Sequence, residues 1–297
     1  PLLLSAADHT HSLNQLKTHI DNGAAGIIPK TLCQFPYMLD QKKIARYMVF
    51  SSRLQPVQGK IDRDFTLMCR GGMMSEEEGW MDTLAEAASY AEDHNAHIIG
   101  SLWGEVDWMA EKAAEMERRG MRGVELDIGC PHLDGIHANE SVDKQVDNFL
   151  GRCQGVKKIV DACNIPVIVK MSADTGGEWG PIIQYLREIG VGGVTVHNRF
   201  VGFLPDVETQ HPFLDTWSGV GGPWVVPITC YRINQVRKLD RNMPILATNG
   251  CYDGLDVVRF MLAGASIVQC ASAPLILGPN WVRKTLQEFQ AYLDRKD

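Results

Sequence analysis

Three side chains that can carry protons follow one another near the middle of the chain, at Asp127, Cys130 and His132. They come at the end of an apolar run, residues 123–128, whose composition is typical of a buried β-strand. Pro131 cannot donate to a sheet ladder, so the strand is expected to end before it. A carboxyl group, a thiol and an imidazole at the tip of a strand are candidates for acid–base chemistry. The alternative interpretation is that Cys130 is a buried apolar residue, as most cysteines are.

Short apolar runs recur along the chain, and segments with helical spacing of apolar residues lie between them. Nearly continuous apolar runs are typical of parallel strands that helices cover on both faces. Eight strand–helix units predict an α/β fold whose sheet closes into a (β/α)8 TIM barrel. An open, doubly wound sheet is the alternative, although eight units at this length favour closure. The expected strands are residues 2–6, 26–29, 97–102, 123–128, 166–171, 192–197, 244–247 and 266–270, and helical spacing is clear over 106–119, 254–263 and 281–293.

In such a barrel the C-terminal ends of all strands meet on one face, which carries the active site. The ends of the expected strands carry Lys30, Thr31, Asp127, Lys170, His197, Asn198, Arg199, Asn249 and Ser272. Any one of them has an ordinary structural interpretation, but apolar strands gain no stability from ending in charge. Two long connections, residues 33–75 and 200–226, are expected on the same face, where long loops usually serve binding. Lys170 either stabilises negative charge, forms a Schiff base or is a structural ion-pair partner.

The composition restricts the classes of function. The net charge of −7 argues against a nucleic-acid partner, and no apolar run reaches the length of a membrane span. The first residues lack the basic segment of a signal peptide. The eight cysteines form no Cys-x-x-Cys pair, so we expect reduced thiols in a cytoplasmic protein with no structural metal. No linker or low-complexity tract is visible, which predicts one domain over residues 1–297.

Several motifs resemble one family of flavin enzymes. The segment Glu-Leu-Asp-Ile-Gly-Cys-Pro-His at 125–132 is similar to the Asn-Leu-Ser-Cys-Pro-His/Asn segment of dihydroorotate dehydrogenases and of the FMN domain of dihydropyrimidine dehydrogenases. His132 favours the dihydropyrimidine branch. Further motifs with the family's order are Ile-Pro-Lys-Thr at 28–31, Val-Ile-Val-Lys at 167–170, Ser-Gly-Val-Gly-Gly at 218–222 and Pro-Ile-Leu-Ala-Thr-Asn-Gly at 244–250. The resemblance therefore extends along nearly the whole chain.

The resemblance implies an FMN-dependent oxidoreductase that acts on a CH–CH bond of a small molecule. Flavin N5 would exchange hydride with one carbon, and Cys130 would be the general acid/base at its neighbour. Lys170 would stabilise the reduced, anionic flavin. The phosphate of FMN would be bound by backbone at Gly222, at 249–250 and at 271–272. The residues implied to bind the cofactor are Ala6, Ala7, Lys30, Thr31, Asp127, Lys170, His197, Gly221, Gly222, Asn249, Gly250, Ala271 and Ser272.

The expected substrate pocket departs from the family's pattern. The family binds a cyclic amide with several Asn side chains, which offer both a donor and an acceptor. The corresponding candidates in this chain are Arg70, Asp127, His132, Asn198 and Arg199, of which one is still an Asn. We therefore expect a substrate other than a standard pyrimidine, with an anionic group opposite an Arg. The alternative is that Arg70 and Asp127 pair with each other and only reshape the pocket.

Other functions are compatible with parts of the pattern. Dihydrouridine synthases also have a Gly-Cys-Pro segment and a His-x-Arg like that at 197–199, but they act on tRNA, which the acidic charge of this chain disfavours. A Schiff-base aldolase would use Lys170 and need no flavin, and an inactive barrel would only bind a phosphorylated ligand. The dehydrogenase resemblance further implies a homo-oligomer, and electron exchange with either a diffusible compound or a separate subunit.

Overall fold

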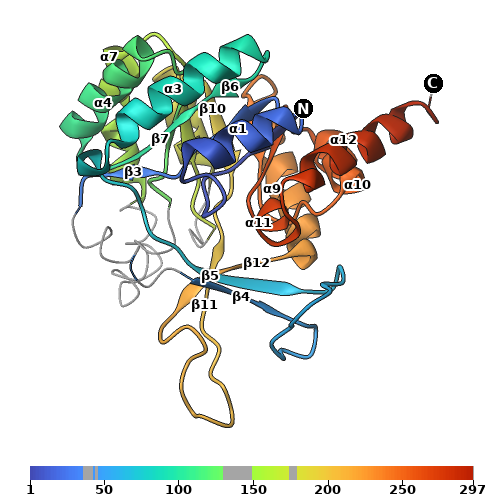
Figure 1. Cartoon of the computed structure of the whole chain (residues 1–297). Helices are drawn as coiled ribbons and strands as arrows, with labels where there is room; N and C mark the ends of the chain where they lie inside the picture. The colour runs from blue at the N-terminus through green and yellow to red at the C-terminus, as the bar shows by residue number, and fades with distance from the viewer. Residues whose placement is uncertain (36–42, 44–45, 130–148, 174–178, 297) are drawn as a thin grey trace.

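The computed structural model describes residues 1–35, 43, 46–129, 149–173 and 179–296. A parallel sheet with helices on its outside forms the larger part, and a small antiparallel sheet lies to one side of it (Figure 1). The strands of the parallel sheet are, in chain order, β1 (Leu2–Leu4), β2 (Gly26–Ile27), β3 (Leu32–Cys33), β6 (His97–Ile98), β7 (Gly100–Trp103), β8 (Val124–Leu126), β9 (Val167–Lys170), β10 (Gly193–Val196), β13 (Ile245–Ala247) and β14 (Ile267–Cys270).

The parallel sheet closes on itself. Its order is β3-β7-β8-β9-β10-β13-β14-β1-β2-β6, but β2 and β3 are two pieces of one stretch of chain, as are β6 and β7. The Ile99 amide donates to the Ile27 carbonyl at 2.9 Å, and the next amide, of Gly100, donates to Gly123 at 2.8 Å. Each interrupted stretch therefore pairs with both of its neighbours. The ten strands occupy eight positions around the barrel, called staves here and numbered in chain order. This closure confirms the predicted (β/α)8 barrel.

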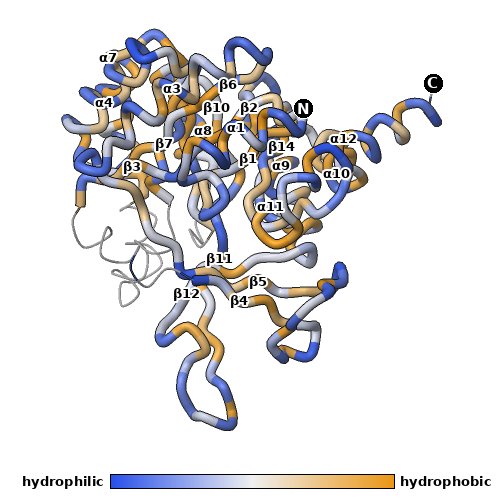
Figure 2. The backbone as a smooth tube through the Cα atoms, in the orientation of Figure 1, coloured by the Kyte–Doolittle hydropathy of each residue, from blue (hydrophilic) through white to orange (hydrophobic). Residues whose placement is uncertain are grey.

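The helices follow the strands as predicted. Those around the barrel are α1 (Leu13–Asp21), α3 (Trp80–Asp93), α4 (Val106–Arg118), α7 (Val156–Ala162), α8 (Trp179–Glu188), α9 (Val226–Leu239), α10 (Gly254–Ala263), α11 (Ser272–Leu277) and α12 (Asn280–Leu293). Helix α10 begins after Asp253, whose side chain accepts hydrogen bonds from two amides of the first turn, an ordinary N-cap. The strands are largely apolar, and the hydrophilic segments lie on outer turns (Figure 2). Among the described residues, no helix has the length and apolar character needed to cross a membrane.

The inside of the barrel is layered, because side chains two apart on a strand point the same way. Leu3, Ile168 and Leu246, from the first, fifth and seventh staves, form an apolar layer. Glu125, Thr195 and Gln269, from the fourth, sixth and eighth staves, form a polar layer joined by hydrogen bonds. In the usual packing of a (β/α)8 barrel, alternate staves fill alternate layers with largely apolar side chains. The carboxylate of Glu125 is unusual in such a layer.

The two long connections pair with each other. They supply β4 (Arg46–Phe50), β5 (Thr66–Arg70), β11 (Phe200–Gly202) and β12 (Ser218–Gly221), in the order β11-β12-β5-β4. Strand β12 pairs with β5 so that Gly219 lies opposite Cys69. The sequence predicted both insertions on the face that carries the strand ends, but not that they would form one antiparallel sheet.

Candidate active site

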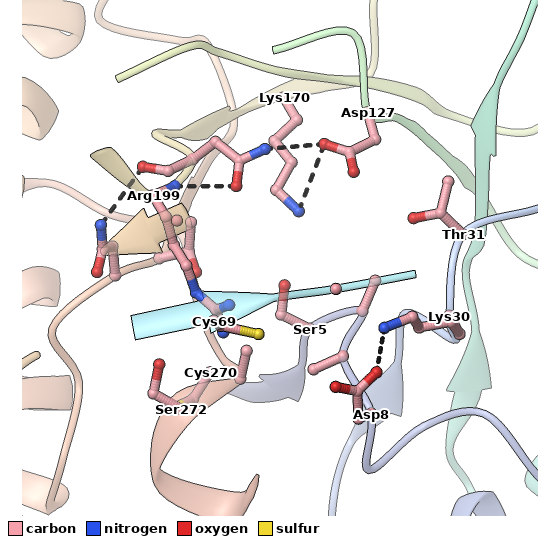
Figure 3. Close-up of a pocket in the computed structure, with 18 of the residues that line it drawn as sticks. Ser5, Asp8, Lys30, Thr31, Cys69, Asp127, Lys170, Arg199, Cys270 and Ser272 are labelled. Carbon is pink, nitrogen blue, oxygen red and sulfur yellow. Dashed lines mark hydrogen bonds and ion pairs between the residues drawn. The ribbon is translucent and has the colours of Figure 1, made fainter. Parts of the chain in front are cut away.

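A cavity that is open to solvent lies at the C-terminal ends of the barrel strands (Figure 3). This is the face on which proteins of this fold usually bind small molecules and cofactors. Most residues that the sequence singled out line it: Ala6, Ala7, Lys30, Thr31, Asp127, Lys170, His197, Asn198, Arg199, Asn249, Gly250, Ala271 and Ser272. They come from seven different staves, so only closure of the barrel brings them together.

Three predicted residues do not line the cavity, and two lie outside the described residues. Gly221 and Gly222 are absent from the lining, and a Cβ on Gly221 would lie 2.5 Å from the Asn249 side-chain oxygen. The Arg70 guanidinium donates to the Leu214 carbonyl at 3.3 Å. Cys130 and His132 belong to the part of the chain that the structure does not describe.

Other lining residues had no assigned role in the sequence. They are Ser5, Asp8, Cys69, Gly71, Gly72, Met73, Gly219, Thr248, Cys251 and Cys270. Ser5 and Thr248 lie two positions after the inward-facing Leu3 and Leu246, so the alternation of the strands would have found them. Cys69 and the residues after it reach the cavity through the antiparallel sheet, a long-range pairing with no local sequence signal.

Lys170 is anchored from below by the polar layer. Its ammonium nitrogen lies 3.2 Å from Glu125 Oε1, and Glu125 Oε2 accepts from Thr195 Oγ1 at 2.6 Å and from Gln269 Nε2 at 3.0 Å. Glu125 is fully buried, and an isolated buried carboxylate would be very unfavourable. The network therefore fixes Lys170 at the wall of the cavity, where its ammonium group is available to a ligand.

Asp127 directly follows strand β8, two residues after Glu125, and lines the cavity. Its Oδ1 accepts from Asn198 Nδ2 at 2.9 Å and lies 3.9 Å from the Lys170 ammonium. Burial raises the pKa of the Asp127 carboxyl, and the charge of Lys170 acts in the opposite direction. A carboxyl group with a raised pKa in a cavity is a candidate for proton transfer.

The neighbouring groups are also engaged. Lys30 pairs with Asp8 at the edge of the cavity. Asn198 uses both ends of its amide, because its oxygen accepts from the Arg199 amide at 2.9 Å. Burial lowers the pKa of His197 to about 4, so its ring is neutral near pH 7.

Arg199 reaches into the cavity toward Cys69 (Figure 3). Gly219 makes room for it, because a Cβ there would lie 3.2 Å from Arg199 Cδ. Within the described part of the chain, no hydrogen bond or ion pair holds its guanidinium. A cation in this position is available to a bound anion.

Behind the first strand end, His9 and His19 form a buried pair. His9 Nδ1 lies 3.1 Å from His19 Nε2, and the rings meet edge to face at 4.9 Å. Burial, and then the neighbouring His19, lower the pKa of His9 well below its ordinary value, and burial lowers that of His19. Both rings are therefore neutral near pH 7 and resist protonation.

The closed barrel with its cavity at the strand ends defines a (β/α)8 protein with the site on the usual catalytic face. A family model described as dihydroorotate dehydrogenase matches residues 66–293. The chain therefore belongs to the dihydroorotate dehydrogenase family, as the motifs had indicated. Membership of the dihydropyrimidine branch, which His132 favoured, stays a prediction.

Three relatives show how far the similarity extends. Dihydroorotate dehydrogenase A (fumarate) of Limosilactobacillus reuteri is 28% identical over 192 residues, which are 64% of this chain and 56% of the relative. The catalytic subunit of dihydroorotate dehydrogenase B (NAD(+)) of Methanocaldococcus jannaschii is 30% identical over 207 residues, 68% and 64% of the two chains. The corresponding subunit of Bacillus pumilus is 25% identical over 262 residues, which are 84% of this chain and 82% of the relative. The chain thus spans little more than half the length of the first relative.

Gly129 is predicted to be indispensable to the geometry of the site. A Cβ there would lie 2.5 Å from the Ser172 amide nitrogen and 2.6 Å from the Lys170 carbonyl oxygen. Because both are backbone atoms, Gly129→Ala should push the fourth strand end away from the fifth and lower the free energy of unfolding by about 1–3 kcal/mol. Denaturant unfolding measures this. Gly151→Ala is the matched control, since nothing lies within 4 Å of a Cβ there, and equal effects in the two variants would contradict the prediction.

The histidine pair predicts loss of stability in acid. An unfolded histidine takes up a proton near its ordinary pKa of about 6.5, whereas buried His9 does so only at lower pH. Stability should therefore be complete above about pH 6.5 and fall as the pH drops from there toward the pKa of the folded state. His9→Gln should make the melting temperature less dependent on pH between 7 and 5. The exposed His211→Gln should leave this dependence as it is, and a similar flattening in that control would remove His9 as the cause.

Proposed function

We propose that the chain is an FMN-dependent oxidoreductase that exchanges hydride with a C–C bond of a small molecule. The observation that carries the proposal is the placement of Lys170. Lys170 lines the same cavity as the segments 249–250 and 271–272, which follow the seventh and eighth staves. Those stave ends are where barrels of this class commonly bind phosphate. The proposal extends to the whole chain, residues 1–297, as one catalytic domain.

The residues present fit a phosphate group at that end. Gly250 has a φ of +104°, which favours glycine, and a Cβ there would lie 2.9 Å from the Val226 amide nitrogen. The backbone of Gly250 therefore packs directly against that of Val226 without an intervening side chain, which supports a cradle of amides for phosphate oxygens.

When bound, FMN would supply the hydride exchange, and the residues of the chain would supply charge and position. Lys170 would stabilise negative charge that develops beside it. The Glu125 network would keep the lysine side chain from moving away from that charge. Cys130 would move the proton at the carbon next to the one that exchanges hydride, a role that rests on the family motif at 125–132.

The substrate pocket supports a substrate other than a standard pyrimidine. A cyclic amide needs donors and acceptors side by side, whereas Asn198 already spends its oxygen on the Arg199 amide and one N–H on Asp127. The cavity offers instead the guanidinium of Arg199. We therefore propose a substrate with a carboxylate or another anionic group opposite Arg199.

The names of the relatives bear on the electron partner. Those from M. jannaschii and B. pumilus are named as catalytic subunits, which supports exchange of electrons with a separate subunit, whereas that from L. reuteri is named for fumarate, a diffusible compound. A homo-oligomer remains part of the proposal by resemblance. The Schiff-base alternative is weaker, because a nucleophilic lysine must be neutral and Lys170 lies between two carboxylates.

The purified chain is expected to carry FMN. Its absorption spectrum should show the two bands of an oxidised flavin in the near ultraviolet and the blue, and denaturation should release FMN. Chromatography of the released chromophore identifies it. A colourless protein that also takes up no added FMN would overturn the proposal. Covalent trapping of a carbonyl substrate on Lys170 by borohydride would then support the aldolase alternative.

Placing an acid in the phosphate cradle should expel the cofactor. Ser272→Asp puts a carboxylate against the expected phosphate, so we expect FMN to bind at least tenfold more weakly, because like charges at close range repel. Fluorescence titration of the apoprotein with FMN measures the affinity. Asn280→Asp is the control, because it adds the same charge at the start of α12, outside the residues that line the cavity. Its affinity for FMN should equal that of the wild type. An unchanged affinity in Ser272→Asp would place the phosphate elsewhere.

A further inference from the structure

We propose that Asp127 is a second proton carrier of the cavity, which takes up a proton when negative charge is placed beside Lys170. The inference rests on the proposed binding of FMN and deepens it. It would make proton uptake by the protein part of flavin reduction, separate from the proton that Cys130 would exchange with the substrate.

The geometry places three charges in a row. Glu125 Oε1 lies 3.2 Å from the Lys170 ammonium, which lies 3.9 Å from Asp127 Oδ1. Their side chains are 0%, 7% and 10% exposed. One carboxylate oxygen of Asp127 is held by Asn198, and the other is directed into the cavity (Figure 3). That second oxygen is the one that a proton from solvent can reach.

The row holds one positive and two negative charges when every group is ionised, and so carries a net charge of −1. A buried net charge is unfavourable, and protonation of one carboxylate removes it. Glu125 is the less accessible acceptor, because it is fully buried and one of its oxygens already accepts hydrogen bonds from Thr195 and Gln269. Asp127, with one oxygen facing the cavity, is the more suitable site for the proton.

The groups that face Asp127 come from several staves. Lys170 and Lys30 favour its ionised form, as does the hydrogen bond from Asn198, whereas Glu125 disfavours it. The thiol of Cys33 is also within electrostatic range. Burial is the largest influence and raises the pKa of Asp127 above that of an ordinary carboxyl. A further negative charge beside Lys170 would offset part of the lysine's influence and raise this pKa again.

A reductant such as dithionite would supply two electrons, and the flavin would take one proton from water at N5, so that one added negative charge would lie beside Lys170. Asp127 would then take a second proton from water. Both steps leave hydroxide to the buffer, and no bond to carbon forms or breaks. By linkage, protonation of Asp127 must favour reduction as much as reduction favours protonation.

The test is the midpoint potential of bound FMN as a function of pH, in the wild-type chain and in Asp127→Asn. The amide is nearly isosteric and resembles the protonated acid in being neutral. We expect the potential of the variant to lie above that of the wild type at alkaline pH, where Asp127 is ionised. The two curves should converge as the pH is lowered. Over the pH range in which they approach each other, the wild type should take up as much as one more proton per reduction than the variant.

The controls separate this proposal from the proposed function. Asp62→Asn removes a carboxylate whose side chain is 77% exposed, and its curve should follow the wild type at every pH. If Asp127→Asn does not fold, Asp127→Ser is the second neutral variant. FMN bound normally with superimposable curves for the wild type and the neutral variant would overturn the role of Asp127 alone. A chain that binds no FMN would overturn the proposed function and this inference with it.

Discussion

The interior of the barrel contains a fully buried carboxylate, Glu125, and the candidate site depends on how its charge is compensated. Apolar side chains fill the neighbouring layer, so Glu125 has no solvent to stabilise it. Thr195 and Gln269 donate hydrogen bonds from two other staves, and Lys170 supplies the opposite charge from a third. The need to neutralise one buried charge thus fixes the lysine that the proposed chemistry requires.

The second constraint is steric and acts where strand ends and insertions meet. Gly129, Gly219 and Gly250 each stand where a Cβ would come within about 3 Å of another segment. At Gly219 the space is used by Arg199, which reaches the cavity past the β12 backbone. Because glycine has no side chain, these positions leave room for charged side chains and, as we propose, for a phosphate.

The charges of the cavity distinguish this chain from the pattern of Asn residues expected for a pyrimidine site. Asp127 and Arg199 stand where the resemblance to the family motif leads us to expect neutral residues. Asn198, the Asn that is kept, is occupied by its protein neighbours. A pocket lined by charged side chains selects ligands by charge, whereas a pocket of amides selects them by paired donors and acceptors.

The sequence by itself determined the barrel and most of one rim. Apolar runs with helical segments between them predicted the staves, and Lys30, Asp127, Lys170 and Asn249 could be found because each lies at or just after the end of its own strand. Only the tertiary structure decided which groups interact. The pairing of β5 with β12, which brings Cys69 to the cavity, and the contacts of Glu125 with Lys170 and Gln269 join residues far apart in the chain. No local pattern specifies such contacts, because they depend on closure, register and the space left by packing.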